Sequence, residues 1–344
     1  MGTIADKLSK LTATKNAIKA ALTGKGVTVS DNDTFASYAD KIGEISDINP
    51  AWTDWRYFSY SNNRNDLVSK LKYTDTAQGT NFSNMFYGCN SLAAVPEIDT
   101  AQGTSFSNMF YGCTSLASVP AIDTARGTSF NNMCQNCAAL ASVPAINTAQ
   151  GTNFSYMFYG CRLLAAVPAI NTARGTIFSS MFYGCTSLAS VPEIDTAQGT
   201  NFNSMFSGCT KLAAAPPLDT SKGTSFSSMF YNCTSLASVP ALDISKCTST
   251  YDVFYNCAAL ENLALTGLVK TSGLNLSYSS KLSKASIASV INALDASVSG
   301  KSVTLSRTAV NAAFETAAGA NDGSASAEWQ NLIAAKSNWT ISLS

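Results

Sequence analysis

The hydrophobic positions between residues 75 and 260 recur every 24 residues, and polar or small residues fill the positions between them. The first full copy reads DTAQGTNFSNMFYGCNSLAAVPEI, and the next copy begins directly after it. A fixed period of about 20–50 residues predicts a stack of coils, because each coil buries its hydrophobic face against its neighbours. Cysteine keeps one register through the array, at Cys89, Cys113, Cys137, Cys161, Cys185, Cys209, Cys233 and Cys257.

Each copy divides into three parts. The part L-x-x-V-x-x-I, first found at residues 92–98, predicts a short strand whose copies stack as a parallel sheet. The part DTAQGT predicts a turn, because Asp and Asn side chains bond nearby amides and the glycines (Gly79 and its copies) permit unusual dihedral angles. The part TNFSNMFYGC predicts one helical or 3₁₀ turn, which buries Phe82, Met85, Phe86 and Cys89 against the sheet.

The repeat resembles the BspA-like leucine-rich repeat in its pattern D-T-x-x-x-T-x-F-x-x-M-F-x-x-C-x-x-L. The resemblance covers about residues 52–265. It implies an α/β fold, a right-handed leucine-rich-repeat solenoid of about eight coils with a parallel sheet. The family occurs in bacterial surface proteins, in protist surface proteins and in phage tail proteins. One copy of the pattern consists of Asp99, Thr100, Thr104, Phe106, Met109, Phe110, Cys113 and Leu116.

Residues 3–22 predict a helix in front of the array. Its seam residues are spaced alternately four and three apart, as in a heptad pattern with a single lysine. Two interpretations stay open: the helix packs on its own chain, or it joins copies of the chain into an oligomer. A second, short helix is expected at about residues 34–43. The seam consists of Ile4, Leu8, Leu11, Lys15, Ile18 and Leu22.

The stretch LTATKNAIKAALTGKGVTVSDNDTFASYADKIGEI resembles a short module found near the N-termini of bacteriophage tail and tail-fibre proteins. The resemblance implies that residues 1–49 form a helical attachment or oligomerisation module. Residues 50–74 follow the repeat frame imperfectly, so we expect them to be the N-terminal cap that covers the exposed end of the core in residues 75–265.

Residues 266–344 lose the period and predict an α/β C-terminal cap. Strands and helices alternate there with short connections, which predicts a parallel sheet. The expected strands are 274–276, 303–305 and 339–343, and the expected helices are about 283–296, 307–317 and 326–336.

Charge does not point to a nucleic-acid or membrane partner. Only 13% of the residues are charged, and the 22 basic residues balance the 22 acidic ones. No apolar run is long enough for a transmembrane helix, and the N-terminus lacks the continuous apolar stretch of a secretory signal. The sequence has no histidine, the commonest general base and metal ligand.

No catalytic or cofactor motif interrupts the repetition. Glu97 and Glu193 depart from it, but they lie four coils apart, too far for the two carboxylates of a glycosidase. The row of Asp and Asn residues lacks the calcium-binding repeat pattern, and we interpret the cysteines as buried, reduced hydrophobes. We therefore expect no enzyme activity, no cofactor and no metal.

The residue after each Met-Phe pair is the best candidate for ligand binding. A row of partly exposed tyrosines offers a large contact area at low entropic cost. The alternative is that the rings stack on one another and seal the surface. Glutamine and serine interrupt the row at Gln135 and Ser207, and the tyrosines are Tyr87, Tyr111, Tyr159, Tyr183, Tyr231 and Tyr255.

Taken together, these patterns predict a non-enzymatic phage (or prophage) tail or tail-fibre component. It would reside in the virion, contact other tail proteins, form a homo-oligomer through residues 1–22, and present its repeats to a bacterial surface receptor. The alternative is a BspA-like adhesin on a bacterial cell surface that binds a host protein or glycan. Both hypotheses rest on resemblance, because a fold does not determine a function.

Overall fold

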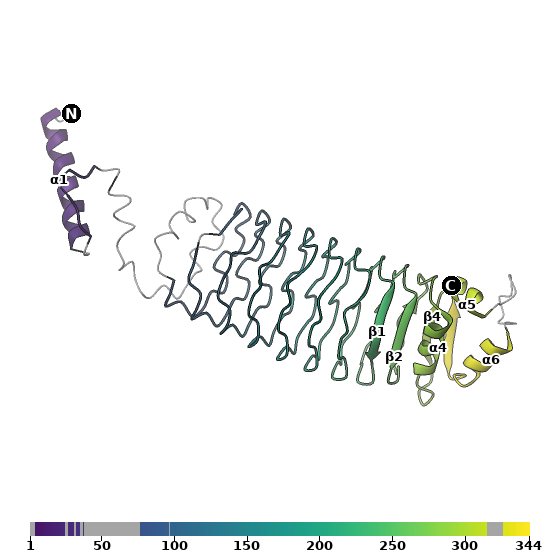
Figure 1. The fold of residues 1–344 in the computed structure, drawn as a ribbon. Coiled ribbons are helices and arrows are strands. Elements are labelled where there is room, and N and C mark those ends of the chain that lie inside the picture. Colours follow the sequence, from purple (N-terminus) through teal and green to yellow (C-terminus); the bar gives the residue numbers. More distant parts are fainter. Residues whose placement is uncertain are drawn as a thin grey trace.

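The computed structural model describes residues 4–24, 27–30, 32–34, 37, 76–95, 97–314 and 326–344. From residue 76 onward the repeats stand side by side as coils of one elongated array (Figure 1). Consecutive coils pair in parallel through single residues one repeat apart, such as Asn81 with Ser105 and Ser105 with Ser129. The predicted repeat solenoid is therefore present.

The predicted N-terminal helix is confirmed as α1, Ile4–Thr23. The end of its seam packs on the chain that follows, because Ile18 and Leu22 form a small cluster with Val27 and Val29. Leu11, earlier in the seam, is 53% exposed. The side chains of the first two seam residues, most of the predicted helix at 34–43 and the predicted cap at 50–74 lie outside the described residues.

The predicted helical turn is wrong: this segment is a run of hydrogen-bonded turns. Asn84 and Gly88 have φ of 62° and 69°, in the left-handed region, so a right-handed helix cannot continue through them. The amide groups bond alternately within the coil and to the next coil. Met85 donates to the carbonyl of Phe82 at 3.3 Å, whereas Phe86 donates to that of Met109, in the next coil, at 2.8 Å.

The predicted sheet of L-x-x-V-x-x-I segments forms only at the end of the array. β1 (Ser238–Asp243) and β2 (Asn262–Thr266) pair in parallel as a two-stranded sheet. In the earlier described coils, single bridges such as Ser118 with Ser142 replace a sheet. A proline inside each of these segments has no amide hydrogen to donate, and β2 is a copy that lacks the proline.

The core of the array is a set of ladders of identical side chains. The rings of Phe106 and Phe130 stack with centroids 5.7 Å apart, and the other ring pairs of this row are similar. Ala101 donates its amide to Asp99 Oδ1 at 2.9 Å, which confirms the predicted Asx turn. The predicted role of the turn glycines was wrong. A Cβ on Gly103 would lie 2.6 Å from the Phe106 ring, so glycine makes room for phenylalanine.

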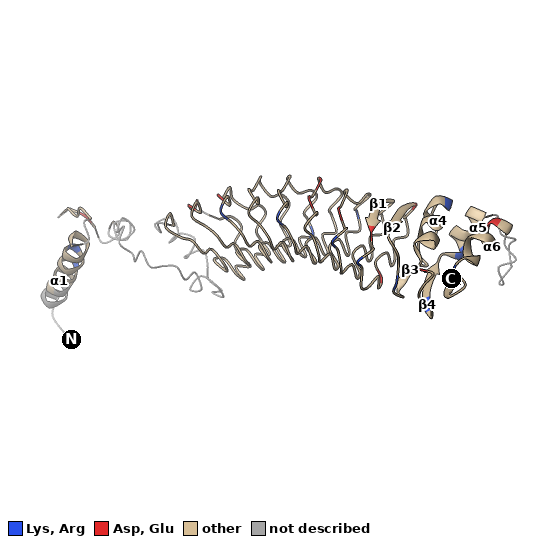
Figure 2. Ribbon diagram, turned by 90° about the horizontal axis from the view of Figure 1, so that it is seen from below, with Lys and Arg blue, Asp and Glu red and all other residues tan. Residues whose placement is uncertain are grey.

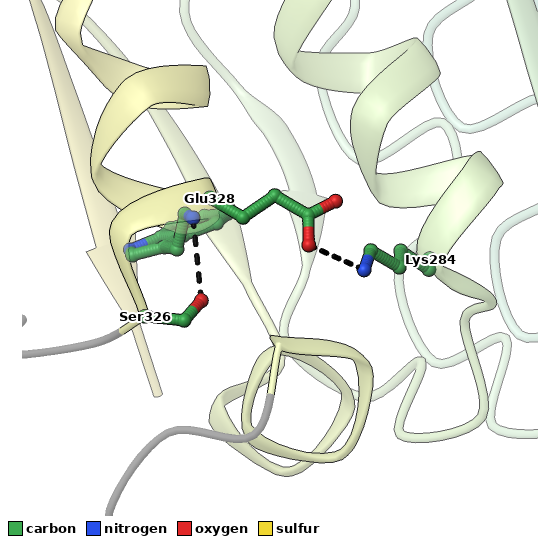
Figure 3. A network of polar contacts seen from close by, with 4 residues as sticks. Lys284, Ser326 and Glu328 are labelled. Carbon is green, nitrogen blue, oxygen red and sulfur yellow. Dashed lines mark hydrogen bonds and ion pairs between the residues drawn. The ribbon is translucent and has the colours of Figure 1, made fainter.

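The predicted strands and helices of the C-terminal region are confirmed. The three strands form a parallel sheet in the order β3-β4-β5. Ser326 caps α6, and an ion pair between Lys284 and Glu328, 2.6 Å long, joins α4 to α6 (Figure 3). The elements are β3 (Leu274–Leu276), α4 (Lys284–Ala293), β4 (Lys301–Leu305), α5 (Arg307–Phe314), α6 (Ala327–Ala334) and β5 (Trp339–Leu343).

Candidate binding surface and pocket

The six predicted tyrosines occupy equivalent places on the turn segment, and we call them the tyrosine row. Each follows a residue whose side chain is buried, as Tyr183 follows Phe182. The tyrosine itself bonds within its own coil, since the Tyr183 amide donates to the carbonyl of Ser180 at 3.2 Å. The backbone thus holds the ring at the surface, next to a buried ladder.

The rings of the tyrosine row stack in pairs. The centroids of Tyr159 and Tyr183 are 4.5 Å apart with an interplanar angle of 4°, and those of Tyr231 and Tyr255 are 5.2 Å apart. The remaining pair stacks in the same way. Tyr183 is still 37% exposed. The rings therefore stack on one another, as the alternative interpretation of the row predicts. Ligand binding by the row stays a prediction.

Two hydroxyl groups of the row, those of Tyr159 and Tyr255, favour the neutral form. Burial, followed by the neighbouring tyrosines, raises the pKa of Tyr159 above its ordinary value. The hydrogen bond to Tyr278 is the main cause that raises the pKa of Tyr255, whose hydroxyl donates to that of Tyr278 at 3.2 Å. Near neutral pH these groups donate and accept hydrogen bonds without carrying charge.

The repeated cysteines form a buried ladder of free thiols, as the sequence indicates. The Sγ of Cys185 donates to the carbonyl of Phe158, in the preceding coil, at 3.0 Å. Burial raises the pKa of Cys185 and of Cys257 to about 12. Because the thiolate is the nucleophile and the metal ligand, these groups are poorly suited to catalysis or metal binding.

The acidic residues take structural roles or face solvent. Glu97 and Glu193 are both exposed. Asp219 accepts the amide hydrogen of Ser221 in an Asx turn, and the hydrogen bonds from Ser221 hold the pKa of this carboxyl below its ordinary value. Across the described part of the chain, no group of three His, Cys, Asp or Glu residues could hold a metal ion, and no helix is long and apolar enough to cross a membrane.

Sequence reasoning missed a pocket at the C-terminal end of the tyrosine row. Its volume is about 480 Å³. The row contributes two of its rings, and the last coil and the first two strands of the cap contribute the rest. The signal in the sequence is a pair of departures from the repeat in the last coil. Tyr251 stands where earlier coils have Ser or Asn, and Asp252 stands where they have Asn, Ser or Tyr. The pocket is lined by Tyr231, Tyr251, Asp252, Tyr255, Gly273, Leu274, Asn275, Ser302 and Thr304.

A protein family described as "Mycoplasma protein of unknown function, DUF285" matches residues 56–169 and 152–266, which is more than half of the chain. The chain belongs to this family. The match and the repeat pattern together identify a BspA-like leucine-rich-repeat protein. The match ends at residue 266, so the pocket combines DUF285 repeats with a cap that lies beyond them.

Two solved structures are similar to this DUF285 protein. The leucine-rich-repeat protein of T. pallidum is 20% identical over 58% of this chain and 80% of its own, with a TM-score of 0.33. A leucine-rich cell surface protein of Faecalibacterium prausnitzii is 19% identical over 54% of this chain and 76% of its own, with a TM-score of 0.23. No curated protein sequence matches the chain significantly.

Proposed function

We propose that the protein is a non-enzymatic adhesin on a bacterial cell surface, and that its tyrosine row contacts a host protein or glycan. The observation that carries this proposal is the series of stacked, part-exposed tyrosine pairs along the array. Tyrosine is favoured at contact surfaces because a rigid ring with a polar tip gains contact area and loses little entropy.

The surroundings of the row support recognition by contact area and not by charge. Figure 2 shows acidic and basic residues scattered singly along the described coils. The protein as a whole carries no net charge. An uncharged partner surface, with hydroxyl or amide groups that meet the tyrosine hydroxyls, fits such a row.

The phage-tail prediction remains the second candidate. It rests on the module near the N-terminus, much of which lies outside the described residues, and the comparisons support the cell-surface alternative better. The two candidates differ in partner and in assembly. An adhesin binds host cells, whereas a tail fibre binds bacteria and forms an oligomer through residues 1–22.

Cell binding tests the proposal. The double variant Tyr159→Ala/Tyr183→Ala should bind animal cells at least about tenfold more weakly, because it removes a complete stacked pair from the contact surface. Leu163→Ala is the matched control, since this leucine is 56% exposed on the same coil and lies outside the row. Binding by the double variant at the wild-type level would contradict the proposal.

Thermal unfolding shows whether the tyrosine pair acts through contact with the partner or through the stability of the array. A large fall in Tm for the double variant would mean that the pair stabilises the array, and the binding loss would then be indirect. Bacterial cells serve as the second binding target. Selective binding to bacteria, with a trimer that becomes a monomer when the chain starts at Pro50, would favour the phage-tail candidate.

A further inference from the structure

We infer that the pocket between the last coil and the cap binds the end of a neutral saccharide. This inference deepens the proposed function, because it names a ligand class for one end of the tyrosine row. The turn at residues 251–255 and the strands β3 and β4 line this pocket together. The two strands are labelled in Figure 2. A volume of about 480 Å³ lies within the range of small-ligand pockets, roughly 300–1,000 Å³.

The floor of the pocket is the polar face of the cap sheet. Asn275 of β3 pairs directly with Thr304 of β4. Successive side chains of a strand point to opposite faces of the sheet. The leucines of β3 and β4 and Val303 are therefore buried, and the polar residues between them face outward. Within the described residues, Asn275 Nδ2 and the hydroxyls of Ser302 and Thr304 make no hydrogen bond. These groups are therefore available to a ligand.

The wall of the pocket is aromatic. Tyr251 is 61% exposed, and the stacked pair of Tyr231 and Tyr255 stands beside it. The backbone at Tyr251 lies close to Gly273, which directly precedes β3 of the cap. Gly273 has φ of +100°, and a Cβ there would lie 3.1 Å from the Tyr251 Cα. The Asp252 amide donates to the Gly273 carbonyl at 3.0 Å, which fixes this approach.

Tyr251 and Asp252, the two residues of the last coil that depart from the repeat, both line the pocket. The position of Tyr251 is serine or asparagine in every earlier full coil, and that of Asp252 is asparagine, serine or tyrosine. Asp252 keeps the left-handed conformation of its equivalents, with φ of 54°. Within the described residues its carboxylate makes no hydrogen bond or ion pair. The substitutions thus change the surface chemistry of the coil and leave its backbone as before.

This combination of groups selects a hydroxyl-rich, uncharged ligand. A sugar ring has an apolar C–H face that packs on an aromatic ring, and its hydroxyls can bond amides, hydroxyls and a carboxylate. No lysine or arginine lines the pocket, and Asp252 disfavours an anionic group at this place. A neutral saccharide satisfies all of these groups together.

Ligand-observed NMR on the full chain tests the inference, with the methyl glycosides of glucose, galactose, mannose and N-acetylglucosamine as probes. At least one probe should bind. Tyr251→Ala should weaken that binding by about tenfold, because the variant removes the aromatic wall. Asn275→Ala should weaken it about fivefold, through the loss of one hydrogen-bonding group. Tyr251→Phe should retain most of the binding, since the ring stays.

Two control variants keep the result specific to the pocket. Thr340→Ala removes a hydroxyl from an exposed position on β5 outside the pocket, and Tyr156→Ala removes an exposed tyrosine far along the array. Both should bind the probe as the unchanged protein does. The inference is overturned if no glycoside binds, if Tyr251→Ala and Asn275→Ala bind unchanged, or if short neutral peptides bind at the pocket and the glycosides do not.

The test of the pocket and the test of the proposed function can fail independently of each other. Loss of cell binding in Tyr159→Ala/Tyr183→Ala with glycoside binding intact would support the row and leave the pocket result to be judged by its own variants. Glycoside binding that is lost in Tyr251→Ala supports the pocket even when the row variant still binds cells.

Discussion

The repeat array and the C-terminal cap reach a buried core by different routes. In the array, each residue type stacks on its own copy one coil away, and most described coils have no regular helix or strand. In the cap, helices cover a parallel sheet, and unlike residues interlock, as Phe314 does with Trp329. Order comes from repetition in the first region and from secondary structure in the second.

The two routes to a core imply different sources of stability for the array and the cap. A coil contacts only its two neighbours, so the stability of the array is a sum of interfaces between adjacent coils. A single change in a ladder residue therefore weakens two interfaces. In the cap, a change of similar size is shared among several elements around one core.

The largest effect should come from the phenylalanine ladder. Phe178 is fully buried and stacks on Phe154 and Phe202. Phe178→Ala should lower the free energy of unfolding by about 3–5 kcal/mol, because the cavity opens toward both neighbours. Denaturant titration followed by circular dichroism measures this. Phe314→Ala, a deletion of the same size in the cap, should cost less, because α4, α5 and α6 share the core around this ring. Equal costs would remove the contrast between the two regions.

The thiol ladder should make the array sensitive to alkaline pH. Burial raises the pKa of Cys185 from 9.0 to about 12, so between these values the unfolded chain loses a proton that the folded chain keeps. Stability is therefore fully present below pH 9 and falls as pH rises, by about 1.4 kcal/mol per pH unit for each such thiol.

Comparing the wild type with Cys185→Ala isolates this contribution. Denaturant titrations between pH 8 and pH 11 should give a shallower decline for the variant, by about one such slope. Parallel curves for the two proteins would mean that the Cys185 thiol keeps its ordinary pKa in the folded state.

Loss of a buried hydroxyl group should destabilise the array less than these changes. Thr196 Oγ1 donates to the Asp219 carbonyl, in the next coil, at 2.8 Å, and the side chain is buried. Thr196→Val should cost about 1–2 kcal/mol, because the carbonyl loses its donor. Thr200→Val is the control: its hydroxyl is exposed, so water replaces the lost bond. A shift in Tm of the same size for both variants would contradict this.

The smallest effect should come from the cap surface. Lys284 and Glu328 form an ion pair, but their side chains are 49% and 60% exposed. Lys284→Met should cost about 0.2–1 kcal/mol, and added salt should reduce the difference from the wild type. A loss that persists at high salt would assign the effect to the contact of Lys284 with the Phe314 ring, 5.2 Å away.

The sequence predicts contacts in the array better than it predicts backbone shape, and in the cap it predicts both. The strict period indicates that Phe106 meets Phe130. It does not indicate the left-handed φ of Asn84, because Tyr156 and Ser180 take the same conformation with side chains that give no such signal. In the cap, the alternation of strand and helix patterns in residues 274–343 predicts the strands and helices directly.

For the site, the period predicts a tyrosine row but not the pocket at its end. The row is visible because its members recur in one register. The pocket requires Ser302 and Thr304 to come beside Tyr251, and this depends on the order of strands in the cap sheet. No local pattern encodes that juxtaposition.

The backbone hydrogen bond from the Phe86 amide to the Met109 carbonyl, and its copies, join successive coils. These hydrogen bonds therefore run along the length of the array, in which the coils stand side by side (Figure 1). A pull on its two ends therefore loads these bonds one coil after another. Each coil that detaches releases its 24 residues, about 80 Å of extended chain. Under tension the array should lengthen in equal steps, each ended by the next intact ladder, and so act as an extensible tether.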